Sequence, residues 1–262
     1  MNHKCGFRRD LLSVIFALII LATGSTMAGQ TVNTDADEIL RSMSSFLAST
    51  KAFSVAVNIS NEIITKEGEK LQFNSSGTLL LQRPAHFHIN RQSRLGDVEM
   101  FFDGKTVTIY GKSLKSYFQQ DVVGTTDDAF SVIGGSLGVD LPATDLLVAD
   151  PYAALTEGVT SSGYYGTDYV QGVECHHLGF RAEKVDWQVW VRTGDEPLPM
   201  KFVITTKWMT GAPQYSVQLS NWNLKPVIAA DRFTFVAPSG TEKLQSLPVD
   251  ETGEIADRKE VK

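Results

Sequence analysis

The chain has 262 residues, of which 24 are basic and 30 acidic, so its formal net charge at pH 7 is −6. A mildly acidic chain without a basic stripe argues against nucleic acid and against an anionic membrane surface as partners. The length is sufficient for one domain with a substantial hydrophobic core of its own.

The first 28 residues have the order of a secretory signal peptide. Three basic residues precede an apolar run over residues 11–22, and small residues follow it up to Ala28. The run is too short to cross about 30 Å of hydrocarbon comfortably as a helix. We therefore expect cleavage after about Ala28 and a periplasmic protein that does not span the membrane after processing. The remaining chain would hold 21 basic and 29 acidic residues, a net charge of −8.

A helix is predicted near the start of the processed chain. Asp35 and Glu38 stand three residues apart and resemble a capping box. The apolar residues that follow fall at i, i+1, i+4, i+7 and i+8, which is one face of a helix. We expect this face to lie against a sheet. The apolar positions are Ile39, Leu40, Met43, Phe46 and Leu47.

Alternating apolar and polar residues predict a run of antiparallel strands in the next part of the chain. A charged turn over residues 66–70 and an Asp103-Gly104 turn separate two of the strand pairs, and Asp-Gly is a strong hairpin signal. The expected strands cover residues 53–60, 71–82, 87–91, 98–102, 107–110 and 117–120.

A helical insert is predicted to interrupt this series. Phe130, Ile133 and Leu137 repeat at helical spacing, and glycines at 134 and 135 weaken the middle of the segment. A second short helix is expected over residues 141–147, stopped by Asp150-Pro151. The insert should cover part of the apolar face of the sheet.

Strands return from residue 166 onward. The face that holds Trp187 and Val189 is apolar, whereas Asp186 and Gln188 lie on the opposite face with Trp190. Further strands are expected over residues 197–207, 215–222 and 233–236, and a flexible polar tail over residues 239–262. These elements predict an α+β protein with one large curved antiparallel sheet, covered by the first helix and the insert.

The second strand series and the segment before it carry several distinctive motifs. They are Val170-Gln171-Gly172, Cys175-His176-His177, residues 186–191, Pro197-Leu198-Pro199 and Val203-Ile204-Thr205, preceded by Leu141-Pro142 and Asp150-Pro151. These motifs resemble the predicted periplasmic proteins of domain of unknown function family 2092. That family is similar to the LolA/LolB superfamily, which implies an incomplete barrel with helices plugging its open side around a hydrophobic cavity. Residues 29–238 would form this half-barrel domain.

The resemblance implies a non-catalytic carrier or sensor that binds a hydrophobic small molecule, a lipid or a lipidated protein. No Gly-x-Ser-x-Gly or His-Glu-x-x-His motif is present, and we expect no cofactor. The inward direction of the face that holds Phe202 and Ile204 is an assumption. The residues expected to line the cavity are Phe130, Ile133, Leu137, Trp187, Val189, Phe202 and Ile204.

Two alternatives remain open at this stage. Cys175 and His177 share a strand face and are weak candidates for a metal or thiolate site, which would need a third ligand such as His86 or His88. A buried free thiol beside a hydrogen-bonded histidine is the simpler interpretation. Alternatively, Trp190, Trp208 and Trp222 could form a surface for an envelope protein partner or a regulatory contact, although tryptophans are often exposed at sheet rims.

Overall fold

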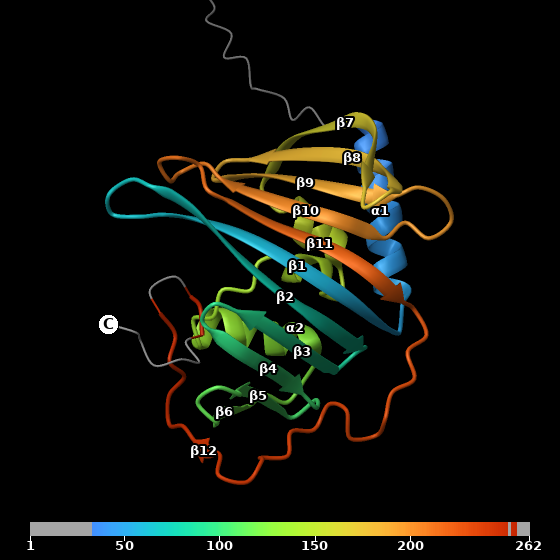
Figure 1. Cartoon of the computed structure of the whole chain (residues 1–262). Coiled ribbons are helices and arrows are strands. Elements are labelled where there is room, and N and C mark those ends of the chain that lie inside the picture. The colour runs from blue at the N-terminus through green and yellow to red at the C-terminus, as the bar shows by residue number, and fades with distance from the viewer. Residues whose placement is uncertain (1–32, 251–252, 256–262) are drawn as a thin grey trace, which may run out of the picture. The chain divides into compact units, whose positions relative to one another are not determined.

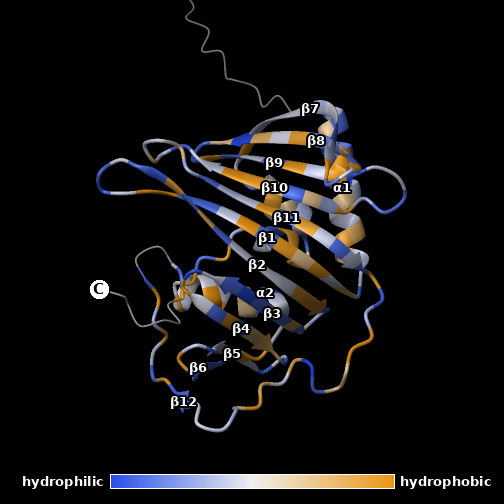
Figure 2. Cartoon of the chain, in the orientation of Figure 1, coloured by the Kyte–Doolittle hydropathy of each residue, from blue (hydrophilic) through white to orange (hydrophobic). Residues whose placement is uncertain are grey.

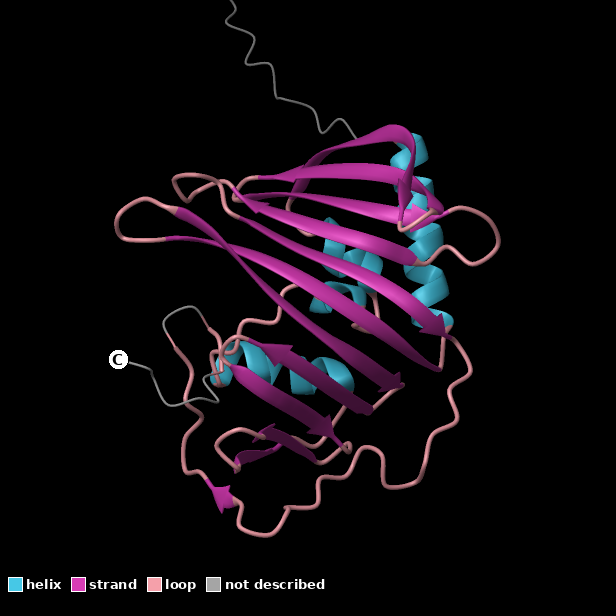
Figure 3. Cartoon of the chain, in the orientation of Figure 1, coloured by secondary structure: helices cyan, strands magenta, loops and turns pink. Residues whose placement is uncertain are grey.

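The computed structural model describes residues 33–250 and 253–255. The predicted signal peptide, residues 1–28, lies outside the described residues. Figures 1 and 3 show the strands as one sheet, with the helices behind it in this view. The helical segments are α1 (Thr34–Ser49), α2 (Thr126–Ser131), the π-helix η1 (Val132–Ser136), the 3₁₀-helix η2 (Thr144–Leu146) and α3 (Pro151–Thr156). The strands are β1 (Ala52–Ile64), β2 (Lys70–Gln82), β3 (His86–Ser93), β4 (Gly96–Phe102), β5 (Thr106–Gly111), β6 (Ser116–Asp121), β7 (Val159–Val170), β8 (Val173–Ala182), β9 (Val185–Arg192), β10 (Pro199–Thr206), β11 (Gln214–Asn223) and β12 (Glu242–Lys243).

The sheet is open and has 12 strands in the order β12-β6-β5-β4-β3-β2-β1-β11-β10-β9-β8-β7. Two meanders, β1 to β6 and β7 to β11, join where β1 pairs with β11. Neighbouring strands are antiparallel except for the short parallel pair of β12 and β6. Strands β7 and β12 are the two edges, so the sheet does not close into a barrel (Figure 1). This confirms the predicted α+β fold with one large antiparallel sheet.

Successive side chains along each strand point to opposite faces of the sheet, and they form a large core on the inner face and a smaller one on the outer face. The inner face joins both meanders to α1 and the insert, and Figure 2 shows apolar residues alternating along the strands. Phe202 lies in this inner core and Ile204 packs against it, while Val203 belongs to the outer cluster. The assumed inward direction of Phe202 and Ile204 is therefore confirmed. The outer cluster consists of Val170, Cys175, Trp190, Met200 and Val203.

Helix α1 begins earlier in the chain than a cap at Asp35 would place it. The side chain of Asn33 accepts a hydrogen bond from the backbone N–H of Ala36 at 3.0 Å, so Asn33 is the N-cap. The predicted capping box of Asp35 and Glu38 is wrong, because Asp35 already lies inside the first turn, where a carboxylate suits the helix dipole. The predicted apolar face is confirmed by the burial of Leu40, Met43 and Leu47.

The helical insert is less regular than the sequence predicts. Thr125 and Asp128 form a capping box at the start of α2, which passes directly into the π-helix η1. Residues 141–147 contain only the 3₁₀ turn η2, preceded by Ala143 in a left-handed conformation at φ 72°. Asp150-Pro151 was expected to stop a helix. Instead Asp150 caps α3 and Pro151 occupies its first turn, where a missing N–H costs nothing.

The segment after β11 packs on the outer face instead of adding the predicted strand over residues 233–236. Phe233 is buried, and the ring of Phe235 lies 5.0–5.6 Å from the rings of Phe101, Tyr110 and Tyr117. The alternation of this segment thus serves aromatic packing rather than strand pairing, so the strand prediction is wrong.

Part of the predicted flexible tail contacts the sheet. Glu242 and Lys243 pair with β6 as β12, and Ile255 is buried in the inner core. Glu254 forms an ion pair with Arg91 at 2.6 Å. The tail boundary at residue 239 and the domain limits stay predictions.

Candidate functional site

An apolar cavity of about 120 Å³ lies on the inner face where the insert crosses the first meander and β11. Its floor is set by the register of the central strands, which places Val57 opposite Leu219 and Ile59 opposite Val217. The insert covers this floor with the loop around η2. The apolar lining residues are Val57, Ile59, Leu79, Ile89, Met100, Leu141, Pro142, Ala143, Leu146, Leu147, Val217 and Leu219.

One end of this cavity is polar. The guanidinium of Arg91, whose side chain is 12% exposed, pairs with Glu254, and Asp140 and Tyr215 line the same end. Desolvation raises the pKa of Asp140, and the nearby Glu254 carboxylate raises it further. Burial also raises the pKa of Tyr215, which keeps its hydroxyl protonated at neutral pH. An apolar chamber with a polar end matches an amphiphilic ligand.

The size of the cavity limits what it holds without rearrangement. A dry protein cavity of about 150 Å³ accommodates benzene. The volume of about 120 Å³ therefore fits a short apolar group of similar or smaller size. A long acyl chain would need the covering loop to move outward.

None of the seven predicted ligand-binding residues lines this cavity. In the insert, Ile133 is fully buried, Phe130 stacks on Phe87 with ring centroids 5.0 Å apart, and Leu137 packs against the core. The other four, Trp187, Val189, Phe202 and Ile204, belong to or pack against the inner core of the second meander. Their contact with a ligand stays a prediction.

The residues that do line the cavity carry a weak sequence signal. Val57 and Ile59 belong to the apolar face of the first predicted strand, and Leu146 and Leu147 to the second predicted helix of the insert. Alternation identifies the inward face of each strand but not which part of that face stays unfilled. The polar end was missed because Arg91 and Glu254 are far apart in the sequence.

Cys175 belongs to the outer cluster, and His177 lies against it. The thiol of Cys175 is fully buried, and burial raises its pKa to about 11, so the reactive thiolate is scarce at neutral pH. His177 stacks on Trp190 at 4.1 Å, and its Nε2 lies 2.9 Å from Gln188 Oε1. Five strands separate β8 from β3, which carries His86 and His88.

The fold therefore does not bring a third ligand to Cys175 and His177. Across residues 33–250 and 253–255, no group of three or more histidine, cysteine or carboxylate side chains is arranged to hold a metal ion.

The three tryptophans proposed for a partner surface differ in exposure. Trp190 is 7% exposed, and its indole N–H donates to Asp168 at 2.9 Å, so its assignment to an exposed surface is wrong. Trp222 is partly buried and packs at 5.2 Å against Phe53. Trp208 alone of the three is largely exposed, at 71%.

The open antiparallel sheet, its helical cover and the apolar cavity between them define an α+β protein with an unclosed half-barrel sheet. The model of the family described as "Predicted periplasmic protein (DUF2092)" matches residues 36–247, and the chain belongs to this family. The family description agrees with the expected periplasmic location. Within the described residues no helix is long and apolar enough to cross a membrane. None of the curated proteins matches the sequence.

Several solved structures are similar to parts of this chain, all at low sequence identity. An uncharacterized conserved protein from Thermus thermophilus is 11% identical with a TM-score of 0.48, covering 80% of this chain and 98% of that one. LprF from Mycobacterium bovis is 13% identical with a TM-score of 0.46, covering 78% and 99%. A LolA superfamily protein from Nitrosomonas europaea is 10% identical with a TM-score of 0.37, covering 76% and 97%.

Proposed function

We propose that the chain is a non-catalytic periplasmic carrier or sensor that binds the apolar part of an amphiphile in the cavity beneath the insert. The ligand is an acyl chain, a lipid or the lipid group of a lipidated protein. The observation that carries this proposal is an unfilled apolar chamber on the inner face, ending at Arg91, Asp140 and Glu254. Ordinary cores are close-packed, so a hollow of this kind is a candidate ligand site.

The energetics favour an apolar ligand. Each methylene that leaves water contributes about 0.8 kcal/mol, so a segment of about five methylenes contributes about 4 kcal/mol. The polar end lies at one side of the same chamber and would hold the head group near Tyr215 and Arg91. This orients an amphiphile with its tail under the insert.

Entry of a longer chain requires the insert to shift, and its construction supports such movement. The backbone there changes from α-helix to π-helix at Val132 and to a 3₁₀ turn at Thr144. Irregular helical segments have poorer hydrogen-bond geometry than a continuous α-helix. The insert is therefore the part of the cover that we expect to open.

The test combines two measurements on the purified protein. Extracted lipid is identified by mass spectrometry, and binding of the fluorescent fatty acid cis-parinaric acid is measured by titration and displacement. We expect Val217→Phe, which places a ring in the cavity, to weaken probe binding at least about tenfold, or about 1.4 kcal/mol.

The matched control is Gln218→Phe, which adds the same ring to the opposite face of β11 and should bind like the unchanged protein. Absence of both co-purified lipid and probe binding would overturn the proposal. If Val217→Phe binds the probe as strongly as the unchanged protein, the ligand does not bind in this cavity.

A further inference from the structure

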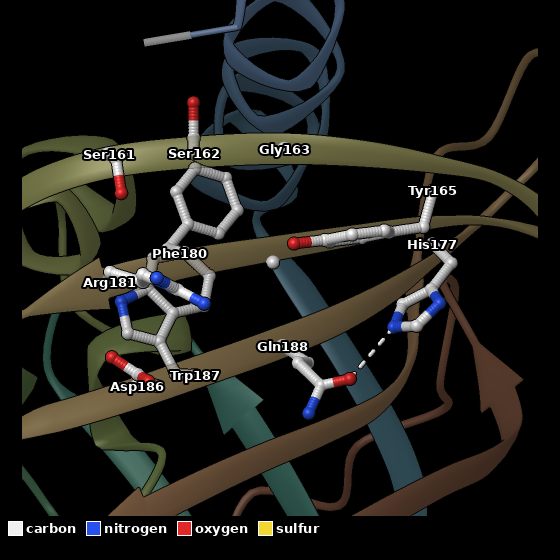
Figure 4. Close-up of a pocket in the computed structure, with 11 residues that line it drawn as sticks. Ser161, Ser162, Gly163, Tyr165, His177, Phe180, Arg181, Asp186, Trp187 and Gln188 are labelled. Atoms are coloured by element: carbon white, nitrogen blue, oxygen red, sulfur yellow. Dashed lines mark hydrogen bonds between the residues drawn. The ribbon is translucent and has the colours of Figure 1, made fainter. Parts of the chain in front are cut away.

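A second hollow lies on the outer face, over β7, β8 and β9, on the opposite side of the sheet from the apolar cavity. Its volume is about 460 Å³, within the range of about 300–1,000 Å³ that is usual for small-molecule sites. Its lining is mainly polar and charged, and its aromatic residues are Tyr165, His177, Phe180 and Trp187, of which Phe180 and Trp187 are buried. Figure 4 shows Tyr165 on one side of this hollow and Arg181 with Asp186 on the other.

Tyr165 follows the inward-facing Tyr164 and therefore lies on this face, and a β-bulge interrupts β7 directly beside it. Tyr164 pairs with Leu178, but the next pair is Thr167 with His176, so β7 holds one extra residue here. Gly166 takes the left-handed conformation that the bulge needs, at φ 91°. Bulges of this kind re-aim a side chain and recur next to functional sites.

Two glycines form the floor beneath the tyrosine ring. A Cβ atom at Gly179 would lie 2.7 Å from Tyr165 Cε2, and one at Gly163 would lie 3.1 Å from its Cζ. The ring therefore occupies space that only glycine leaves free. Tyr165 is nevertheless 66% exposed, so a large part of its surface remains open to a ligand.

Two of the polar groups around the hollow, those of Gln188 and Asp186, are held in place by neighbours. Gln188 Oε1 lies 2.9 Å from His177 Nε2, which leaves the amide N–H groups of Gln188 available. Asp186 is fixed by an ion pair with Lys207 at 2.9 Å. Arg181 is exposed and sits opposite Asp186 in the strand register, and no ion pair of Arg181 is found among the described residues.

We propose that this outer hollow is a saccharide site, in which the exposed face of Tyr165 stacks on a pyranose ring while Gln188, Asp186 and Arg181 hydrogen-bond its hydroxyl groups. A pyranose combines an apolar C–H face with a rim of hydroxyls. An aromatic ring beside a fixed amide, a fixed carboxylate and an exposed guanidinium complements both features. The polar lining disfavours an acyl chain, so this site is independent of the proposed cavity ligand.

The same pyranose chemistry is available from free sugars and from the glycan strands of the cell wall. The experiment therefore has two arms on the purified full chain. Isothermal titration uses the disaccharides chitobiose, cellobiose and maltose, and co-sedimentation uses purified peptidoglycan sacculi. Disaccharide binding supports a free-sugar source, and retention on sacculi without disaccharide binding supports a polymer source.

Two variants and a control locate the binding. We expect Tyr165→Ala to weaken saccharide binding at least about tenfold, since stacked aromatic side chains dominate many recognition sites. Gly179→Ala should cause a similar loss although Tyr165 is retained, because the added methyl group displaces its ring. Tyr169→Ala removes a tyrosine of the same strand that is equally exposed, at 68%, but lies outside the hollow, and should change nothing.

Thermal unfolding of each variant confirms that it folds, and cis-parinaric acid binding should remain unchanged in all three. The proposal is overturned if the unchanged protein binds neither the disaccharides nor the sacculi. It is equally overturned if a folded Tyr165→Ala protein binds them as strongly as the unchanged chain.

Discussion

The two meanders of the sheet bury their inner faces under different covers. Strands β7, β8 and β9 lie under α1, a continuous helix whose buried side chains recur at regular spacing. There Trp187 stacks on Phe180 at 3.9 Å and also contacts Phe202 at 5.6 Å. Strands β1 to β4 lie instead under the irregular loop around η2, and the apolar cavity remains between them.

This difference indicates how a sheet can hold both a filled core and a ligand chamber. A regular helix presents ridges of side chains that interdigitate with a sheet. A cover that changes from α- to π- to 3₁₀-helix cannot repeat that spacing, so it leaves space beneath it. In this chain the cavity lies where the backbone of the cover is least regular.

The largest effect that separates the two regions should come from large-to-small substitutions. Leu40→Ala, in the helix α1 that covers the filled half, should lower the free energy of unfolding by about 3 kcal/mol, because it creates a cavity in a tight core. Leu147→Ala enlarges a chamber that already exists and should cost about 1 kcal/mol. Urea unfolding measures both values. Equal losses would show that the two halves are packed alike.

A second difference should appear in acid. Glu99, on the outer face of β4, has its pKa lowered to about 2 by His88, Lys112 and Asn90, from an ordinary value of 4.5. Because the pKa of Glu99 is lower in the folded chain than in the unfolded chain, the ionised carboxylate stabilises the fold. This stabilisation is complete above about pH 4.5 and is lost as the pH falls toward 2. Allowing for solvent screening, we expect a contribution on the order of 2 kcal/mol.

Glu99→Gln should therefore cost on the order of 2 kcal/mol at about pH 6 and little at about pH 2.5, measured by denaturant unfolding. The control lies in the second meander, where Glu196 forms an exposed ion pair with Arg192. Glu196→Gln should cost at most about 0.5 kcal/mol at either pH. A cost of Glu99→Gln that does not depend on pH would refute the ion-pair explanation.

The smallest effects should come from glycines of the insert. A methyl group at Gly135 meets nothing within 4 Å, and the backbone there is not left-handed, so Gly135→Ala should stabilise the protein by about 0.5 kcal/mol. Gly138 has a φ of 68°, so Gly138→Ala should destabilise it by about 1 kcal/mol. Calorimetric melting compares the two. If both variants shift the melting temperature in the same direction, the backbone conformation of these glycines does not determine how the substitutions change stability.

Local pattern determined most of the elements. Alternation over residues 185–191 placed Trp187 and Val189 on the inner face, and helical spacing placed Leu40 and Met43 against the sheet, because side-chain direction follows from backbone period alone. The same pattern failed at residues 233–236, where alternation reflects aromatic packing on an outer face. It also could not tell that Asp150-Pro151 opens a helix, since proline marks both boundaries.

The sequence by itself therefore determined most of the strands and their faces, the α+β class and the buried first helix, all of which depend on residues close together in the chain. Only the tertiary structure decided which inward residues surround a hollow. That outcome required β1 to pair with β11, which brings Ile59 opposite Val217, and required Glu254 to reach Arg91. Volume left between distant segments is a property of how well their surfaces fit together, and no local period encodes it.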